Sequence, residues 1–469
     1  MVELFEKCRP SVVTFTATWR QTRATSRPAD GRPGRTTRVV TVERGSGFIV
    51  HRDGYFLTCS HGLKHGGRFE AHFSGGATHR AREIARDDAL DLALLKIDAP
   101  GPFVPLPLGR SDDLMVGERA VVLGNPDAFG LSLGVGYVTG LGRSTKTDFS
   151  LLTDMIQTDA GINPGISGGP LVNVLGEVIG VATSQRRDAD GLGFATPIDK
   201  VRSALGAMID AQGRYGFVLG LTVAGDTPAK VTGVVAGSPA AAAGLRVGDV
   251  IVRVEKTPIR DGLDFHLALI GRKGGRKLPL TVRRDGRTVE RTPTPGTVAP
   301  LEAEKVAGLA AGLSYEAYAG HWHVLPDFAP LKPVETGTMP TVALGRWAGK
   351  DSFALRFTGY VEAPSDGIYA FYSASDDGSR VYVGGRLVVD SDGLHGPVEK
   401  RGFVPLKAGL HALRVEYFEA SGDEALAVAW EGPGLRKQPI AAKALRHKPP
   451  ATKPAPATEP ATRPAAGTE

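Results

Sequence analysis

The sequence predicts a mainly β protein with several domains, and three observations support this prediction. At 469 residues, the chain is long enough for about three domains with separate cores. Its 61 glycines and 33 prolines favour short strands and turns over long helices. Apolar runs bounded by Gly, Asp or Asn, such as "GSGFIV" and "LALLKI", recur from Val12 to Ala195, which is the pattern of strands separated by turns.

Periodicity and aromatic content predict the domain boundaries. Apolar residues at helical spacing in "PIDKVRSALGAMIDAQ" predict a helix that closes the first domain. Aromatic residues are almost absent between Val218 and Gly312, whereas the next 118 residues hold three of the four tryptophans, which indicates separate cores. The predicted units are a first domain at 1–212, a second at 213–297, a linker at 298–312, a β-sandwich at 313–442 and a disordered Pro/Ala/Thr-rich tail at 443–469.

Charge and composition exclude several functions. Part of the net charge of +6 comes from an arginine-rich stretch, residues 20–44, which is interpreted as a mobile solvated loop. Because no aromatic residues are interleaved there for base stacking, no nucleic-acid partner is expected. Apolar runs are too short for a transmembrane helix, and no signal peptide is visible in residues 1–20. Cys8 and Cys59 are too few for a disulfide framework or a cysteine metal site.

One serine lies in an unusually glycine-rich segment, "QTDAGINPGISGGPLVN" (157–173). Alone, Ser167 is interpreted as a turn residue, His61 as a loop histidine and Asp91 as a charge at a strand edge. Together they offer a nucleophile, its base and the carboxylate that orients the base, in the chain order His–Asp–Ser. Glycines beside a nucleophilic serine allow backbone N–H groups to point at a developing oxyanion.

The blocks "GSGFIVHRDGYFLTCSH", "DLALLKI", "GNPDAFGLSLGVGYVTGLGR", "IQTDAGINPGISGGPLVN" and "GLGFATPID" occur in this order, and each resembles the matching block of the HtrA/Deg serine proteases. The resemblance runs from about Val12 to Ala204. It implies a chymotrypsin-like double β-barrel with Ser167 as nucleophile, His61 as general base and Asp91 as its partner. The resemblance also implies catalysis without a cofactor, unfolded proteins as substrates, a periplasmic or extracellular location and assembly into homotrimers. An oxyanion hole is expected at Gly165, Ile166 and Ser167.

Two departures from the family pattern leave a second hypothesis open. The family usually has Asn where this chain has Ile166, and it usually has T-N-x-H-V where this chain has "TCSHGL". Neither change removes a catalytic group, but both could loosen the site, so a catalytically weak, peptide- and carbohydrate-binding scaffold is the alternative. In trypsin-type proteases, which this domain resembles, the base of the specificity pocket lies six residues before the serine. The resemblance therefore implies Gly161 at that position, and the absence of a carboxylate there predicts cleavage after small aliphatic residues.

The second domain resembles the PDZ domains that follow HtrA proteases, because "VVAGSPAAAAGLRVGDVIVRVEKTPI" has the succession Ser-Pro-Ala, Ala-Gly-Leu and Gly-Asp-Val-Ile. PDZ domains add a peptide as an extra strand and bind its terminal carboxylate with backbone N–H groups. The expected peptide-binding residues, which form the "FVLGL" loop, are Val218, Leu219, Gly220 and Leu221.

Residues 313–440 resemble the β-sandwich first described in anthrax protective antigen, through "GYVEAPSDGIYAF", "SDDGSRVYVGGRLVVD" and "LKAGLHALRVEYFEASGDEALAVAWEGPG". Tyr and Phe at alternate positions predict strands with one buried face. Related domains bind carbohydrate, and some use calcium, so a cell-envelope glycan is an expected partner. Asp376 and Asp377 form the expected calcium site, although "DDG" is also a good turn sequence.

Overall fold

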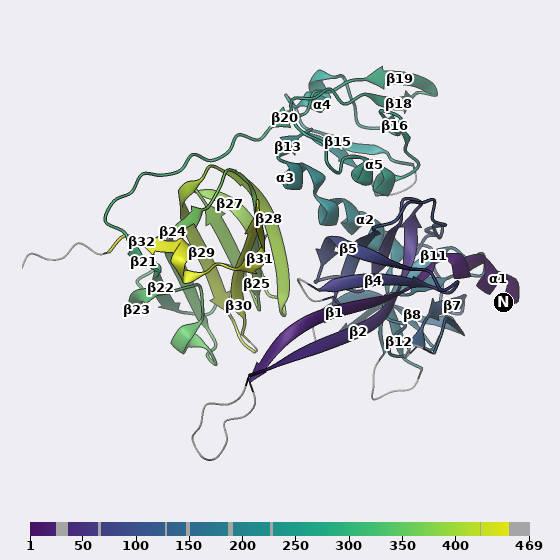
Figure 1. Cartoon of the computed structure of the whole chain (residues 1–469), viewed down its shortest axis with the longest axis horizontal. Coiled ribbons are helices and arrows are strands. Elements are labelled where there is room, and N and C mark those ends of the chain that lie inside the picture. The colour runs from purple at the N-terminus through teal and green to yellow at the C-terminus, as the bar shows by residue number, and fades with distance from the viewer. Residues whose placement is uncertain are drawn as a thin grey trace, which may run out of the picture.

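The computed structural model describes four compact units along the chain (Figure 1). Two lie side by side as β-barrels, a smaller unit lies above them, and a sandwich lies beside them. The described residues are 1–24, 36–63, 67–126, 129–146, 151–185, 191–225, 228–422 and 424–449. Residues 25–35 of the arginine-rich stretch lie outside the described residues, as do residues 450–469. The two ends of that stretch, 20–24 and 36–44, were predicted as part of a loop, but they pair as strands, so the prediction is wrong there. No helix in the described part is long and apolar enough to cross a bilayer.

The first barrel is a closed sheet of six antiparallel strands. In sheet order these are β1 (Val12–Ala24), β2 (Thr36–His51), β3 (Tyr55–Thr58), β6 (Leu92–Ile97), β5 (Thr78–Asp87) and β4 (Arg68–Phe73). Alternate side chains such as Phe15, Ile49 and Phe56 fill its interior and are fully buried or nearly so. Helix α1 (Val2–Cys8) precedes the barrel.

The second barrel is also a closed sheet of six strands. Its strands are β10 (Pro170–Val172), β11 (Val178–Gln185), β12 (Gly193–Pro197), β9 (Leu151–Thr158), β8 (Ser132–Lys146) and β7 (Arg119–Gly124). The two closed barrels confirm the predicted double-barrel fold. Helix α2 (Ile198–Ile209) then closes the unit, as predicted from its periodicity, and buries Val201, Leu205 and Met208.

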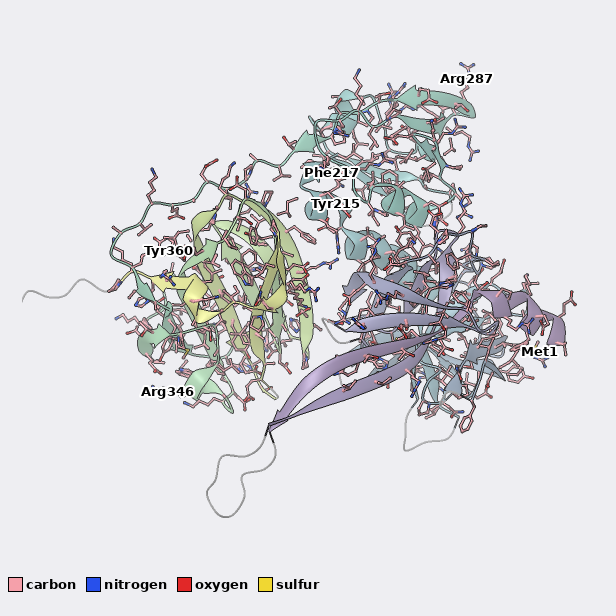
Figure 2. The ribbon with its side chains drawn as sticks, viewed as in Figure 1. Met1, Tyr215, Phe217, Arg287, Arg346 and Tyr360 are labelled. Carbon is pink, nitrogen blue, oxygen red and sulfur yellow. The ribbon has the colours of Figure 1, made fainter. Side chains whose placement is uncertain are left out.

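A second short helix, α3 (Ala211–Tyr215), connects the barrels to the next domain. Figure 2 shows Tyr215 and Phe217 at this junction. That domain contains the sheet β17 (Thr257–Pro258), β16 (Val250–Val254), β18 (Leu280–Arg284) and β19 (Arg287–Arg291). It also contains the pairs β13 (Phe217–Val218) with β20 (Gly296–Thr297) and β14 (Leu221–Val223) with β15 (Val231–Val234), and the helices α4 (Pro239–Ala242) and α5 (Gly262–Ala268). The Ser238 hydroxyl caps α4 by accepting the backbone N–H of Ala241 at 3.2 Å.

The second domain packs on the first barrel through a buried contact between a histidine and an aspartate. His51 Nε2 of β2 lies 3.3 Å from Asp264 Oδ1 of α5, and both side chains are almost inaccessible. Burial would raise the pKa of Asp264, but hydrogen bonds from His51 and Arg260 outweigh it and hold that pKa far below its usual value. The carboxylate is therefore ionised at neutral pH, which keeps this contact between the two domains charged.

The last domain is a sandwich of two antiparallel sheets, as predicted. The larger sheet contains β21 (Ala310–Ala311), β32 (Leu445–His447), β24 (Phe353–Ala363), β29 (Gly409–Glu419), β26 (Ser379–Val383), β27 (Arg386–Ser391), β22 (Leu313–Ala319) and β23 (Glu335–Met339). The smaller contains β28 (Val398–Leu406), β25 (Gly367–Ser375), β30 (Leu426–Gly432) and β31 (Leu435–Pro439). Aromatic side chains such as Phe357, Tyr369 and Tyr417 fill the space between the sheets.

Two predicted boundaries of the sandwich are wrong. Residues 443–449 are not a disordered tail, because β32 pairs with β24 and buries Leu445 completely. Likewise, residues 298–312 are not a free linker. Leu301 bridges to Leu406, and β21 joins the larger sheet through β32. Apolar residues at both ends of the domain complete its core, a long-range effect that local composition does not reveal.

The smaller sheet faces the barrels and the larger sheet faces away from them (Figure 1). Arg401 of β28 donates from Nη2 to the carbonyl oxygen of Met208 at 2.6 Å. The guanidinium of Arg214 lies 5.7 Å from the centre of the Phe403 ring and also donates to the carbonyl oxygen of Ile84 at 2.6 Å. Helix α3 therefore touches the first barrel and the sandwich while it leads into the second domain.

Candidate active site

The structure brings His61 and Asp91 together. Asp91 Oδ2 lies 2.7 Å from His61 Nδ1, and Asp91 Oδ1 accepts the backbone N–H of His61 at 2.9 Å. Asp91 precedes β6 with a left-handed φ of 53°, and its carboxylate is buried, whereas a quarter of the His61 side chain remains exposed. The carboxylate thus holds His61 through one contact to the ring and one to the backbone, and it leaves part of the ring accessible.

Hydrogen bonds of Ser60 and Arg86 stabilise the turn that contains His61. The Ser60 hydroxyl donates to Asp91 Oδ1 at 3.2 Å. Arg86 Nη2 donates to the carbonyl oxygens of Ser60 and Leu63, at 3.3 and 2.5 Å. These contacts fix the backbone on both sides of the histidine, which limits the positions that its ring can take.

The serine turn lies between β9 and β10 in the second barrel. Gly165 and Gly168 flank Ser167 with φ values of 92° and 86°, a conformation that favours glycine. The backbone N–H of Gly168 donates to Ala182 O at 2.7 Å, which ties the turn to β11. Two glycines with left-handed backbones therefore give this turn a shape that other residues would strain.

Ser46 of β2 joins the serine turn to the first barrel through hydrogen bonds. This role of Ser46 was not predicted from the sequence. Its backbone N–H donates to Ser167 O at 2.9 Å, and its hydroxyl donates to Gly165 O at 2.7 Å. The same hydroxyl accepts the N–H of Asn125 at 2.9 Å. The only sequence signal was its place between two glycines in "GSGFIV", where a small residue allows close approach of backbones.

The serine turn also lies against the segment that leads into His61. A Cβ on Gly168 would lie 2.3 Å from Thr58 Oγ1 and 2.8 Å from the backbone nitrogen of Cys59. Within the described residues, Ser167 Oγ forms no hydrogen bond, so the Ser–His hydrogen bond is not formed here. Such bonds are often long in structures without substrate and tighten when substrate binds.

Two backbone N–H groups at the turn are available as oxyanion donors. Among the described residues, the N–H groups of Gly165 and Ser167 donate to no protein acceptor, whereas that of Ile166 donates to Asn163 O at 3.0 Å. The side chain of Ile166 is buried in the second barrel's core. The isoleucine that departs from the family pattern therefore packs inward, away from the donors.

Gly161 and Cys59, which the sequence analysis named, lie in different surroundings: Gly161 borders open space and Cys59 is buried. Gly161 borders open space, since an added Cβ would have only the Asn163 amide within 4 Å. Cys59 is buried and its Sγ donates to Ala182 O at 3.4 Å. Burial, reinforced by the charge of Asp91, raises the pKa of the Cys59 thiol well above its usual value. This thiol is thus neutral and serves as a packing group.

Comparison with known proteins agrees with this geometry. A trypsin-like peptidase domain model matches residues 45–181, a PDZ domain model matches 178–292, and a PA14 domain model matches 345–443. The chain is 36% identical over 275 residues to the putative serine protease HhoA of Synechocystis sp., covering 51% of this chain and 70% of HhoA. The chain belongs to the HtrA family of serine proteases.

Other relatives cover a comparable share of this chain. A probable periplasmic serine endoprotease, DegP-like, of Chlamydia trachomatis is 37% identical over 281 residues, which is 56% of this chain and 55% of that protein. The solved HtrA-type protease AlgW with a decapeptide is 29% identical, with a TM-score of 0.37 over 64% of this chain and 99% of that one.

In the PDZ domain of this HtrA chain, a side chain forms a hydrogen bond with the backbone of the predicted peptide-binding loop. Gln212 of α3 accepts the backbone N–H of Leu219 through Oε1 at 2.7 Å. The side chains of Leu219 and Leu221 are buried in the core, Val218 is half exposed, and Gly220 has a φ of 72°. The loop therefore presents its backbone to Gln212, which the sequence analysis did not predict.

In the PA14 domain, the carboxylate of Glu419 lies beside the predicted pair Asp376 and Asp377. One carboxylate oxygen from each residue lies within 4.8 Å of the others, and all three side chains are buried. Burial and the two aspartate charges raise the pKa of Glu419 to about 7. Among the described residues, Glu419 Oε1 is buried and accepts no hydrogen bond. The three carboxylates therefore offer oxygen ligands, which fits a cation such as calcium.

Proposed function

We propose that this chain is a serine endopeptidase that cleaves unfolded or damaged proteins through an acyl-enzyme on Ser167. His61 Nε2 takes the proton of Ser167 Oγ as the oxygen bonds to the scissile carbonyl carbon, and Asp91 stabilises the imidazolium. The N–H groups of Gly165 and Ser167 stabilise the oxyanion. His61 then protonates the departing amine, and water releases the acyl group by the reverse sequence. The observation that carries this proposal is the buried 2.7 Å contact between Asp91 and His61 beside the pinned serine turn.

A fluorophosphonate probe tests this proposal directly. The full chain should react with the probe at Ser167, identified by peptide mass spectrometry, and should degrade casein. Because the Ser–His hydrogen bond is not formed in this structure, both assays are run with and without a peptide that has an apolar C-terminus. Failure of both under all conditions would favour the alternative of a catalytically weak peptide- and carbohydrate-binding scaffold.

Specificity for small aliphatic residues is expected from Gly161. No carboxylate is present at this position to bind a basic side chain, and the backbone leaves open space there. In a peptide library, cleavage after Val, Ala or Ile should exceed cleavage after Arg or Lys by at least about tenfold, a difference of about 1.4 kcal/mol. Equal or faster cleavage after basic residues would show that the specificity pocket lies elsewhere.

The PDZ domain is proposed to bind C-termini of substrates at the Leu219 loop, in competition with Gln212. Gln212→Ala should free the Leu219 N–H and tighten binding of an apolar C-terminal peptide by roughly two- to tenfold, because a neutral hydrogen bond contributes about 0.5–1.5 kcal/mol. Fluorescence anisotropy with labelled peptide gives the Kd. Gln438→Ala, on an exposed strand of the sandwich, is the matched control. Unchanged or weaker binding by Gln212→Ala would mean that Gln212 supports the loop and does not compete for it.

Calcium is proposed to bind Asp376, Asp377 and Glu419. In calorimetry, 5 mM Ca²⁺ should raise the Tm of the PA14 domain by about 5 °C or more, as expected for a cation well above its Kd. Glu419→Gln should abolish most of this shift, whereas Glu362→Gln, an exposed change on the same sheet, should preserve it. A wild-type Tm that is the same in Ca²⁺ and in EDTA would rule out this site.

A periplasmic or extracellular location and a glycan partner complete the proposal. The DegP-like relative is named as periplasmic, and PA14 domains bind carbohydrate. The PA14 domain would then hold the protease at the cell envelope, near misfolded exported proteins. Cell fractionation with antibody against the full chain tests the location, and a cytoplasmic protein would contradict it.

A further inference from the structure

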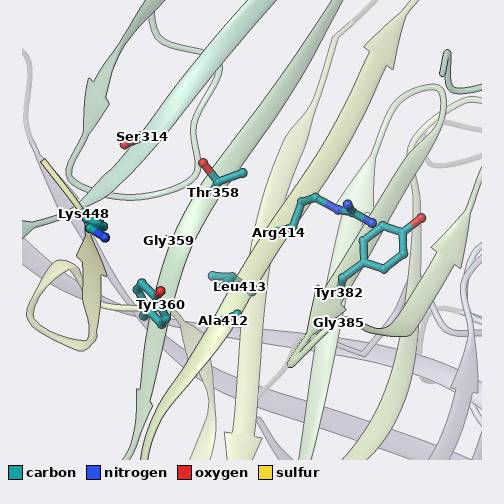
Figure 3. A pocket seen from close by; sticks show the side chains of 10 residues that line it. All are labelled: Ser314, Thr358, Gly359, Tyr360, Tyr382, Gly385, Ala412, Leu413, Arg414 and Lys448. Atoms are coloured by element: carbon teal, nitrogen blue, oxygen red, sulfur yellow. The ribbon is translucent and has the colours of Figure 1, made fainter. Parts of the chain in front are cut away.

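The larger sheet of the PA14 domain carries a groove on its outer face. The groove encloses about 420 Å³, within the usual range for small-ligand sites, and four strands contribute to it (Figure 3). Tyr360, which lines it, is on the side of the sandwich away from the barrels (Figure 2). A ligand there would not meet the protease or the PDZ domain.

A single cross-strand row forms the centre of this groove. Ser314 of β22 pairs with Thr358 of β24, Thr358 pairs with Arg414 of β29, and Arg414 pairs with Tyr382 of β26. Side chains at paired positions project from the same face of a sheet. The row therefore places two hydroxyls, a guanidinium and an aromatic ring in line across four strands.

Arg414 is held in one orientation and keeps donors unused. Its guanidinium carbon lies 3.9 Å from the centre of the Tyr382 ring, and its Nε lies 3.2 Å from Glu416 Oε1. Within the described residues, its two Nη groups donate to no acceptor. The guanidinium is thus pre-oriented, with its terminal nitrogens available for the bidentate contact that arginine makes with a carboxylate.

The other polar groups of the groove are unused as well. In the described part of the chain, the hydroxyls of Ser314, Thr358 and Tyr360 and the ammonium of Lys448 have no side-chain hydrogen bond or ion pair. Of the neighbouring acids, Glu316 is paired with Arg356 at 2.7 Å, whereas Glu416 lies against Nε of Arg414 and offsets part of its charge. The groove therefore combines hydroxyl donors, aromatic surface and two cations.

We propose that this groove binds a saccharide that carries a carboxylate, a uronic-acid glycan, with Arg414 and Lys448 on the carboxylate. Tyr360 supplies apolar surface for a sugar ring, and Ser314 and Thr358 form hydrogen bonds with its hydroxyls. The site is separate from the acidic cluster at Asp377 and Glu419, because Glu419 follows Arg414 by five residues on β29, about 17 Å at the usual strand rise. The inference rests on the proposed glycan partner of the PA14 domain, to which it gives a site and a chemical class, and it does not depend on proteolysis.

Calorimetric titration of the full chain with uronic-acid tetrasaccharides tests this proposal. Galacturonan, mannuronan and glucuronan tetramers are the probes, and methyl-esterified galacturonan, which lacks only the charge, is the matched ligand. At least one acid tetramer should bind with a Kd below about 1 mM, and the ester should bind at least tenfold more weakly. Arg414→Gln should weaken binding at least tenfold and Lys448→Gln about threefold. Arg287→Gln, at the far tip of the PDZ domain (Figure 2), should leave Kd unchanged.

Every other outcome overturns the proposal. Equal binding of acid and ester would remove the role of the carboxylate, and binding unaffected by Arg414→Gln would place the ligand elsewhere. Binding abolished by EDTA and by Asp376→Asn, but not by Arg414→Gln, would assign the glycan to the acidic cluster. Absence of binding by all three acid tetramers would leave the groove without this ligand. None of these results bears on casein cleavage, so proteolysis and glycan binding fail or succeed separately.

Discussion

Replacing Asp91 with asparagine is expected to lower kcat about 10⁴-fold with little change in KM, as in other Ser–His–Asp proteases. Asparagine can still accept the N–H of His61 and the Ser60 hydroxyl through its single oxygen, where Asp91 Oδ1 now lies. Its NH₂ group then faces His61 Nδ1, which must act as an acceptor. The ring proton moves to Nε2, the atom that should take the proton of Ser167.

The fold should survive this substitution. Asp91 has a φ of 53°, and asparagine is among the non-glycine residues that best tolerate a left-handed backbone. Asp154→Asn is the matched control, because Asp154 also has a left-handed φ, 56°, but is exposed on the second barrel. Both variants are compared with the wild type in kcat and KM for a chromogenic peptide and in Tm. A fall in kcat of less than tenfold for Asp91→Asn would exclude the Asp91–His61 pair as the catalytic base system.

The elements that the sequence predicted well are those set by local pattern. The helix predicted from "PIDKVRSALGAMIDAQ" (197–212) appears as α2 and α3. His61 and Asp91, thirty residues apart, meet in space as the resemblance implied. In each case short segments contain most of the information, through periodicity or through a motif of several residues in order.

The features that the sequence did not predict depend on contacts between distant segments. Glu419 joins the aspartate pair only because β29 pairs with β26, and Leu445 enters the sandwich only through pairing with β24. Gln212 reaches Leu219 because α3 turns back beside the PDZ loop. A side chain with no local signature acquires its role from tertiary packing, which residue spacing does not specify.

Gly168→Ala should have the second largest effect, on both stability and activity. A Cβ at this position would lie 2.2 Å from Ser46 O and 2.3 Å from Thr58 Oγ1, both in the buried first barrel. The positive φ of 86° adds backbone strain. Together these should destabilise the protein by about 3 kcal/mol, since strained backbones and overpacked sites each cost about 1–3 kcal/mol. Displacement of Ser167 by even about 1 Å should lower kcat/KM at least about 100-fold.

Gly117→Ala separates the cost of backbone strain from the cost of overpacking. Gly117 also has a positive φ, 99°, but an added Cβ there would meet nothing within 4 Å. Gly117→Ala should therefore cost about 1–2 kcal/mol from backbone strain alone and leave kcat/KM unchanged. Chemical denaturation and peptide hydrolysis measure both quantities. If the two variants lose equal stability and both keep full activity, the close packing of the serine turn on the first barrel does not hold Ser167 in place. If only Gly168→Ala loses activity, the contact between the barrels positions the nucleophile.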